Sequence, residues 1–293
     1  MSAGVMHISR ELREWLSQSM ALGCSEEGMI EGLIGGGYDA DLAHRIVAYA
    51  FSRGGLLPPE AEAEAAADGG PEYEVPQPLP SPLASGASRI VLPDRTVSVV
   101  LSLQKPRVVV VKDFLSDEEC EGLIAQARTR LERSRTINRE TGSNDVHPAR
   151  TSEDTFLDNG STPLVRTICA RIAAFACWPE QRGEDLQVLR YGIGAEYEPH
   201  YDYFDLKDPS TRKILKRGGQ RVATVIMYLN TPEAGGATIF PQSDLEVAAS
   251  RGHALFFSYS SPTPESRSLH GGTPVVAGEK WIATRWLRQT EFR

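Results

Sequence analysis

The stretch "EPHYDYFDL", residues 198–206, places a histidine and an aspartate two positions apart. In a β-strand, residues i and i+2 project from the same face, so His200 and Asp202 can reach one point in space. His270 follows much later, in "SLHGG" at the end of another β-rich run. Two imidazoles and one carboxylate on one face of an octahedron form the facial triad of non-haem Fe(II) sites. For His200 and Asp202 alone, a solvated strand pair is the alternative.

Lys280 lies ten residues after His270, in "HGGTPVVAGEKW". The intervening residues are typical of a strand, a turn and a second strand, so a hairpin would bring Lys280 back near His270. A buried lysine beside a metal needs an anion, because an unpaired buried charge is costly. The distal carboxylate of 2-oxoglutarate is one candidate. A surface lysine at a turn is the alternative reading.

The elements that must position these residues are mostly strands. After residue 185 the chain shows many short β-rich runs separated by tight turns, which indicates a jelly roll or barrel. Before them, "RVVVVKDFL" predicts a buried strand, and a helix should begin at Ser116, with Glu119 completing a capping box. A second helix is expected from a cap at Ser161 or Thr162, with Pro163 in its first turn.

The N-terminal part has a different organisation. Residues 8–53 predict three short helices with apolar residues at helical spacing, which would form a small bundle. Residues 56–88 are rich in Pro, Ala, Glu and Gly and predict a linker. We therefore expect a helical bundle in 1–55 that recruits a protein partner, a linker in 56–88, and a second domain in 89–293.

Composition excludes several classes of protein. The chain has 293 residues, 41% of them hydrophobic and 24% charged, and a net charge of −8, which argues against a nucleic-acid binder. No apolar run is long enough to predict a membrane span, and the first residues lack the apolar core of a signal peptide. The four cysteines form no C-x-x-C pair, so we expect neither a disulfide framework nor a zinc site. A cytoplasmic protein is the expectation.

Several segments together resemble one family. They are "VVKDFLSDEEC", "ARTSEDTFL", "LQVLRYGIGAEYEPHYDYF", "GGQRVATVIMYLNTPEAGGATIFP", "GHALFF" and "SLHGGTPVVAGEKWIATRWL", which span roughly 106–289. This half of the chain resembles the prolyl 4-hydroxylases, Fe(II)- and 2-oxoglutarate-dependent dioxygenases of the collagen-hydroxylase type. The resemblance implies an α+β fold: a double-stranded β-helix, or jelly roll, with flanking helices. The N-terminal helical bundle lies outside it.

The resemblance also implies an activity. The expected reaction is hydroxylation at C4 of prolyl residues in a peptide or protein, with release of succinate and CO₂ and support from L-ascorbate. The same chemistry on free proline, another amino acid or a natural-product intermediate is an alternative. A non-catalytic, metal-binding jelly-roll module is another.

Carried over position by position, the resemblance assigns three side chains to iron: His200, Asp202 and His270. It pairs Lys280 with the distal carboxylate of 2-oxoglutarate, and it places Tyr191 and Thr224 in the same co-substrate pocket. The alternative for Tyr191 is an aromatic residue that only packs within its strand.

The resemblance assigns Arg221, Trp286 and Tyr197 to the substrate site, and Arg150 to a loop that covers the substrate. A core-filling role for the tryptophan and an exposed strand position for Arg221 are alternatives. In a regular strand Tyr197 would face away from His200, so its substrate role requires a bulge.

Three positions carry a residue type that is unusual for the family. Ala237 stands where an acidic residue is usual, and Glu153 and Asp154 stand where smaller residues are common. These departures lie where substrate preference is set.

Strand alternation predicts the orientation of two tyrosines. Tyr201 and Tyr203 should face away from the metal and either pack against other side chains or form the rim of the site.

Overall fold

In the computed structural model, the described residues are 10–52, 87–134, 136–137, 144–145, 151–206, 208 and 211–293. Contacts divide the chain into two compact units. The first comprises residues 1–87 and 173–179, and the second comprises residues 88–172 and 180–293. The candidate chemistry lies in the second unit.

Three helices form the described N-terminal part: α1 (Arg10–Ala21), α2 (Glu26–Gly35) and α3 (Ala40–Ser52). Helix α3 packs against both α1 and α2. Ser25 caps α2, as predicted, because its hydroxyl accepts a hydrogen bond from the Gly28 N–H. Within the described ranges, no helix has both the length and the apolar character to cross a membrane.

The second unit contains a large antiparallel sheet of nine strands. Their order across the sheet is β1 (Arg89–Val91), β2 (Thr96–Leu103), β3 (Arg107–Lys112), β14 (Ala254–Ser258), β10 (Arg221–Tyr228), β17 (Lys280–Arg288), β8 (Leu186–Tyr191), β7 (Glu153–Leu157) and β4 (Glu132–Arg133). Sequence neighbours such as β8 and β9 lie in different sheets, so the chain crosses repeatedly between them.

A second antiparallel sheet has four strands. Their order is β13 (Leu245–Val247), β12 (Thr238–Phe240), β15 (His270–Gly272) and β9 (Tyr197–His200). Two further strand pairs are β11 (Ala234–Gly235) with β16 (Val275–Ala277), and β5 (Thr136–Ile137) with β6 (Asn144–Asp145). The unit is therefore a mixed helix-and-sheet structure whose sheets are antiparallel.

The hydrophobic core of this unit lies between the two sheets. Leu189 and Tyr191 of β8 and Phe257 of β14 pack in one buried cluster with Phe240 of β12 and Val247 of β13. The two strands of the large sheet thus bury alternate residues against the small sheet. Polar side chains, among them Asp202, His270 and Lys280, line a pocket beside this core, and they form the candidate site.

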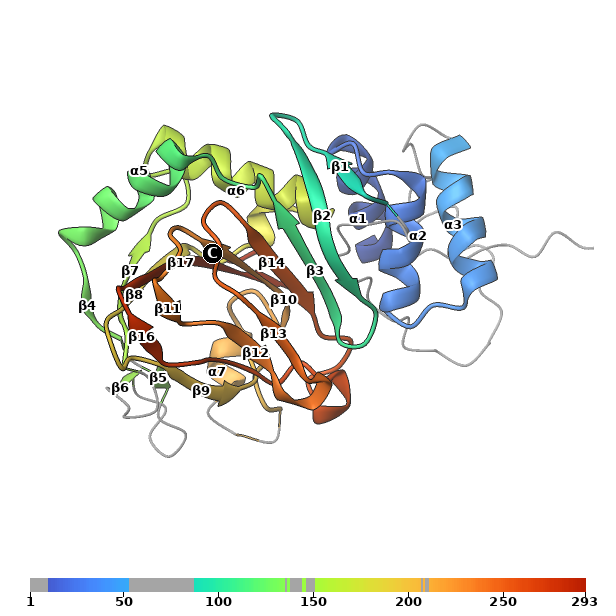
Figure 1. The fold of residues 1–293 in the computed structure, drawn as a ribbon. Coiled ribbons are helices and arrows are strands. Elements are labelled where there is room, and N and C mark those ends of the chain that lie inside the picture. Colours follow the sequence, from blue (N-terminus) through green and yellow to red (C-terminus); the bar gives the residue numbers. More distant parts are fainter. Residues whose placement is uncertain are drawn as a thin grey trace, which may run out of the picture. The chain divides into compact units, whose positions relative to one another are not determined.

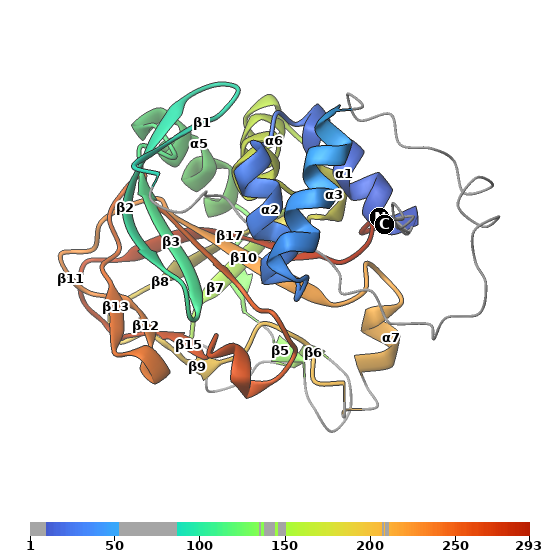
Figure 2. The ribbon, with the colours of Figure 1, turned by 90° about the vertical axis from the view of Figure 1, so that its right-hand side faces the viewer.

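Helices cover the opposite face of the large sheet. They are α5 (Asp117–Arg128) and α6 (Pro163–Ala176), and a short helix α7 (Thr211–Leu215) lies elsewhere in the unit, together with 3₁₀ turns at Glu180–Arg182, Pro241–Ser243 and Pro264–Ser266. Figures 1 and 2 show α5 on one side of the large sheet and β9 and β12 on the other. The site therefore lies on the face of the large sheet that the small sheet covers, away from α5.

The two helix starts follow the sequence signals. The Ser116 hydroxyl accepts from the Glu119 N–H and the Glu119 carboxylate accepts from the Ser116 N–H, so the predicted capping box is present. Helix α6 begins at Pro163, and Thr162 is its cap, because its hydroxyl accepts from the Val165 N–H. This resolves the choice between Ser161 and Thr162.

A buried arginine ties α6 to the start of α5. Arg171, whose side chain is 1% exposed, donates to Asp94, to Glu119 and to the Phe114 carbonyl oxygen. Burial by itself would lower the pKa of this guanidinium, but the two carboxylates raise it. The helices on the outer face are thus held by charge as well as by apolar packing.

Replacing this arginine tests its structural role. Arg171→Ala removes a buried cation that Asp94 and Glu119 share, while Arg95 still pairs with both carboxylates, so we expect the free energy of unfolding to fall by about 2–3 kcal/mol. Urea denaturation followed by tryptophan fluorescence measures the change. Arg166→Ala is the matched control, because Arg166 lies on the exposed side of α6 and should cost less than about 1 kcal/mol. Equal losses in the two variants would contradict the assignment.

Candidate active site

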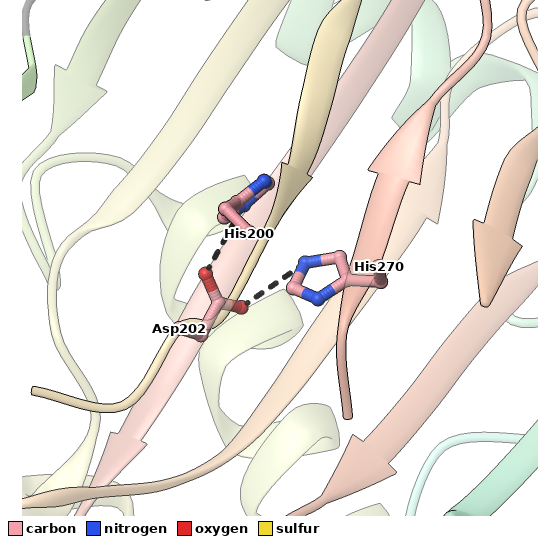
Figure 3. Close-up of side chains that lie close together, drawn as sticks. All are labelled: His200, Asp202 and His270. Atoms are coloured by element: carbon pink, nitrogen blue, oxygen red, sulfur yellow. Dashed lines mark ion pairs between the residues drawn. The ribbon is translucent and has the colours of Figure 1, made fainter. Parts of the chain in front are cut away.

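Three metal-ligand side chains converge where β9 and β15 meet. His200 ends β9, His270 begins β15, and the strand register places them opposite each other. His200 Nε2 lies 3.6 Å from Asp202 Oδ1, and His270 Nε2 lies 3.5 Å from Asp202 Oδ2. One donor atom from each residue lies within 4.8 Å of the others (Figure 3). These separations are longer than a normal hydrogen bond, and the three ligand atoms point to one position that a metal ion could occupy.

Asp202 reaches this point by a route that the sequence did not predict. The prediction of one strand carrying both His200 and Asp202 is wrong, because β9 ends at His200. Asp202 lies in a bend beyond the strand, and its carboxylate turns back towards the two imidazoles. The predicted convergence is present, but a bend produces it.

A glycine permits β9 and β15 to come this close. A Cβ atom on Gly271 would lie 2.9 Å from the Tyr197 carbonyl oxygen and 3.1 Å from the Pro199 nitrogen. Any side chain there would push the strands apart, and with them His200 and His270. The first glycine of "SLHGG" is thus part of the architecture of the site.

The hydrogen bonds of the two imidazoles fix their tautomers. His200 Nδ1 lies 2.8 Å from the Glu198 carbonyl oxygen, and His270 Nδ1 lies 2.9 Å from that of Ser268. A carbonyl oxygen only accepts, so each Nδ1 carries the hydrogen. Each Nε2 then keeps its lone pair towards Asp202, as metal-ligating histidines require.

The protonation states also suit a metal. Burial lowers the pKa of His270 to about 4, against the raising effect of Asp202, so this imidazole is neutral near pH 7. Burial by itself would raise the pKa of Asp202, but interactions with His270, His200 and Arg221 hold it below its usual value. Neutral imidazole and ionised carboxylate are the ligand forms that Fe(II) needs.

A short chain of hydroxyl groups orients Asp202. Thr224 in β10 donates from Oγ1 to Asp202 Oδ2 at 2.6 Å, and Tyr259 Oη lies 2.8 Å from the same Oγ1. Because Thr224 gives its hydrogen to the carboxylate, Tyr259 donates to Thr224. Tyr259 was not among the predicted residues, and no pattern around "FFSYS" marks it. Thr224 lines the pocket, as expected, and also holds a ligand.

The triad borders a pocket that contains a buried cation. The empty space is about 450 Å³, part of it open solvent, and Tyr191, Ile282 and Lys280 line it together with the triad. Lys280 is 3% exposed, its Nζ lies 5.3 Å from the centre of the Tyr191 ring, and burial lowers its pKa to about 8. In the described part of the chain, no carboxylate forms an ion pair with Lys280. The pocket therefore favours an anion.

The path of the chain to Lys280 differs from the predicted hairpin. Strand β16 pairs with β11, and β17 pairs with β8 and β10, so β16 and β17 do not pair with each other. Lys280 lies in β17, opposite Tyr191 in β8. The segment therefore crosses from one sheet to the other, and the lysine still shares the pocket with His270.

An arginine stacks on Trp286, which lines the pocket. Arg221 in β10 lies with its Cζ 3.9 Å from the centre of the Trp286 ring and pairs with Glu184 at 2.7 Å. Arg288 pairs with the same carboxylate at 2.8 Å, so Glu184 bridges two guanidinium groups. Arg221 also lies 3.4 Å from the Asp202 carbonyl oxygen. Glu184 was missed, because nothing in "RGEDLQ" separates it from a surface acid.

Tyr197 reaches the pocket because β9 is irregular. The register against β15 shifts between the His200 and Tyr197 pairs, which is the bulge that the sequence required. Its ring stacks on His200, with 3.7 Å between the centroids. Tyr203 instead packs on the hydrophobic core and lies 4.8 Å from Tyr201, centroid to centroid. Arg150 lies outside the described residues.

Comparisons with known proteins agree with this arrangement. Residues 186–288 match the family model of the 2OG-Fe(II) oxygenase superfamily. Prolyl 4-hydroxylase 2 of Arabidopsis thaliana is 37% identical over 233 residues, which cover 72% of this chain and 75% of that protein. Prolyl 4-hydroxylase 1 of the same plant is 42% identical over 201 residues, covering 63% and 69%. The matched segment 186–288 contains the triad and Lys280.

One solved structure illustrates the similarity. The viral collagen prolyl hydroxylase of Paramecium Bursaria Chlorella virus-1, in its 2OG complex, is 30% identical. The alignment covers 62% of this chain and 95% of that chain, with a TM-score of 0.48.

The close approach of β9 and β15 gives a test that needs no substrate. Gly271→Ala should push the strands apart and weaken binding of Mn(II) or Co(II) by at least about tenfold, because metal affinity depends on how ligands are held. Calorimetric titration measures the affinity, and circular dichroism checks folding. Gly192→Ala is the matched control, since a Cβ there meets nothing within 4 Å. Unchanged affinity in folded Gly271→Ala would contradict the role of this contact.

Proposed function

Because the chain belongs to the prolyl 4-hydroxylase family of Fe(II)- and 2-oxoglutarate-dependent oxygenases, we propose that it hydroxylates C4 of prolyl residues in a peptide or protein. The observation that carries this proposal is one pocket with two kinds of site. The His200–Asp202–His270 triad forms a candidate metal site, and the buried ammonium group of Lys280 forms a separate anion site in the same pocket.

The donor set fits Fe(II). Two imidazoles and one carboxylate leave coordination positions for a co-substrate and O₂. When bound, Fe(II), 2-oxoglutarate and O₂ supply the oxidising chemistry: one oxygen atom becomes the hydroxyl group at C4, the other enters succinate, and CO₂ is released. The chain's own residues bind and orient the metal and the substrates, and they exclude water from the site.

The lysine fits the co-substrate. 2-Oxoglutarate carries a second carboxylate at the far end from its metal-chelating group, and Lys280 would pair with it. Tyr191, beside the ammonium group, would help hold that end of the molecule. Thr224 contributes by holding Asp202 in place. Enclosure of this ion pair would strengthen it, because the low local dielectric constant reduces screening.

The part of the pocket around Trp286 and Tyr197 suits an extended, proline-rich peptide. Trp286 presents a ring against which Arg221 stacks, and Tyr197 lies over His200. Proline-rich segments are preformed as polyproline II and bind to aromatic surfaces at low entropic cost. Glu184 holds Arg221 in its stacked position, so this part of the site is rigid before substrate arrives.

We also propose a fold type, domain limits, a partner and a location for the chain. The two facing antiparallel sheets are consistent with a double-stranded β-helix, or jelly roll. The domain limits 1–55, 56–88 and 89–293, a protein partner for the N-terminal helices and a cytoplasmic location rest on sequence. So does the substrate-covering role of Arg150. L-Ascorbate as a supporting reductant follows from the family.

A turnover assay tests the function. Protein loaded with Fe(II) and supplied with 2-oxoglutarate and a proline-rich peptide should release succinate, and the peptide should gain the mass of one oxygen atom. Asp202→Ala should reduce both signals to the level without iron, because the facial triad loses a ligand. Turnover of free L-proline but of no peptide would overturn the peptide assignment. Unaltered turnover in Asp202→Ala would overturn the site.

The titration of Lys280 gives a pH dependence. Its pKa of about 8 means that it is charged below pH 8 and loses its proton as the pH rises further. The dissociation constant of 2-oxoglutarate on Mn(II)-loaded protein should therefore rise about tenfold per pH unit above 8. Lys280→Met should bind weakly at every pH and show no such rise. The same rise in this variant would assign the dependence to another group.

A further inference from the structure

The segment that carries Asp202 needs support, because it has no strand of its own. Strand β9 ends at His200, and the described residues 201–206 belong to no strand or helix. His200 and His270 are held by the pairing of β9 with β15 in the small sheet. Asp202 lies two residues beyond that pairing, so another contact must fix the path of the chain after it.

One buried carboxamide provides such a contact. The Phe204 N–H donates to Gln220 Oε1 at 2.8 Å, and Gln220 Nε2 donates to the Phe204 carbonyl oxygen, also at 2.8 Å. A neighbouring antiparallel strand would offer the same pair of bonds. Among the residues that the structure describes, no backbone group bonds to Phe204, so Gln220 takes the place of a strand partner. Only a carboxamide side chain both accepts and donates in this way at neutral pH.

Gln220 is itself fixed to the large sheet. It directly precedes β10 and is 7% exposed. Its N–H donates to Gln289 Oε1, and its carbonyl oxygen accepts from the Gln289 N–H, both at 2.9 Å. Gln289 directly follows β17, which pairs with β10. The carboxamide is therefore anchored where these two paired strands meet the loops.

The bend that contains Asp202 is thus held at both ends. His200 holds one end through β9, and Phe204 holds the other through Gln220. The Phe204 ring also lies against two guanidinium groups, with its centre 4.9 Å from Arg221 Cζ and 5.0 Å from Arg288 Cζ. Each residue of the bend has only two soft backbone torsions, so fixing both ends restricts where the Asp202 carboxylate can go.

We propose that Gln220 is a positioning residue that sets the place of Asp202 relative to the two histidines. The inference rests on the proposed function, because it takes His200, Asp202 and His270 as metal ligands. The histidines belong to the small sheet, whereas Asp202 is tied to the large sheet by Gln220 and by Thr224 of β10. Gln220 lies outside the pocket lining, so it acts on the metal only through Asp202.

Metal affinity in a double-mutant cycle tests this role. Gln220→Leu nearly keeps the size of the side chain and removes both bonds to Phe204, so the dissociation constant of Ni(II) should rise about tenfold or more. Ni(II) is the probe because it binds well to imidazole, which keeps variants without the carboxylate measurable. In an Asp202→Ala background, the same change should alter the dissociation constant by less than about twofold. Calorimetric titration measures all four proteins.

Two further variants make the result specific. The Thr211 hydroxyl, also buried, donates to the carbonyl oxygens of Asp205 and Asp208 further along the same segment. Thr211→Val is therefore the matched control and should stay within about twofold of the wild type. Gln220→Glu keeps the acceptor for the Phe204 N–H and loses the donor, so it should also weaken Ni(II) binding. Circular dichroism checks folding, and Gln220→Glu decides the matter if Gln220→Leu does not fold.

The outcomes separate this inference from the proposed function. Unchanged affinity in a folded Gln220 variant overturns the inference. An equal loss in Thr211→Val, or an undiminished loss in the Asp202→Ala background, also overturns it, because Gln220 would then act only on general stability. These results leave the proposed function standing, which turnover by the wild type decides separately. Ni(II) binding that is the same in wild type and Asp202→Ala would overturn both.

Discussion

The close approach of two short strands is the constraint on which the site depends. Strands β9 and β15 approach so closely at Gly271 that a Cβ atom would meet the Tyr197 carbonyl oxygen at 2.9 Å. This contact brings His200 and His270 opposite each other. Backbone carbonyl oxygens then fix both rings with Nε2 towards Asp202. Backbone contacts on paired strands thus orient the two histidines, and strands hold a site more precisely than loops do.

Buried charge divides the pocket into regions of different chemistry. Asp202 is held by the hydroxyl groups of Thr224 and Tyr259, and Lys280 sits apart from any carboxylate of the described chain. One region therefore attracts a metal cation and another attracts an anion. Arg221 is neutralised by Glu184 and presents a flat, stacked surface instead of a free charge. This separation suits a dicarboxylate that binds between metal and lysine, with a peptide on the remaining side.

Much of the site follows from residue types and spacing, and the errors are instructive. The triad and Lys280 were expected from the resemblance to the prolyl 4-hydroxylases, and the bulge at Tyr197 was required if that residue was to reach the substrate site. The predictions of a strand through Asp202 and of a hairpin to Lys280 were wrong. The alternation of residue types along a segment does not show where a strand ends or which sheet the next strand joins. Glu184 and Tyr259 were missed because their roles arise from partners distant in sequence.

The sequence by itself supplied the candidate groups of the centre, which are two histidines and an aspartate suited to a metal and a lysine suited to an anion, and it indicated many short strands. Only the tertiary structure decided how these groups are held and what surrounds them. The register of β7 against β8 places Asp154 on the same face of the sheet as Leu189, which lines the pocket, and Glu153 on the opposite face. Adjacent residues thus face different environments, because register depends on pairing between distant segments, and no local pattern specifies that pairing.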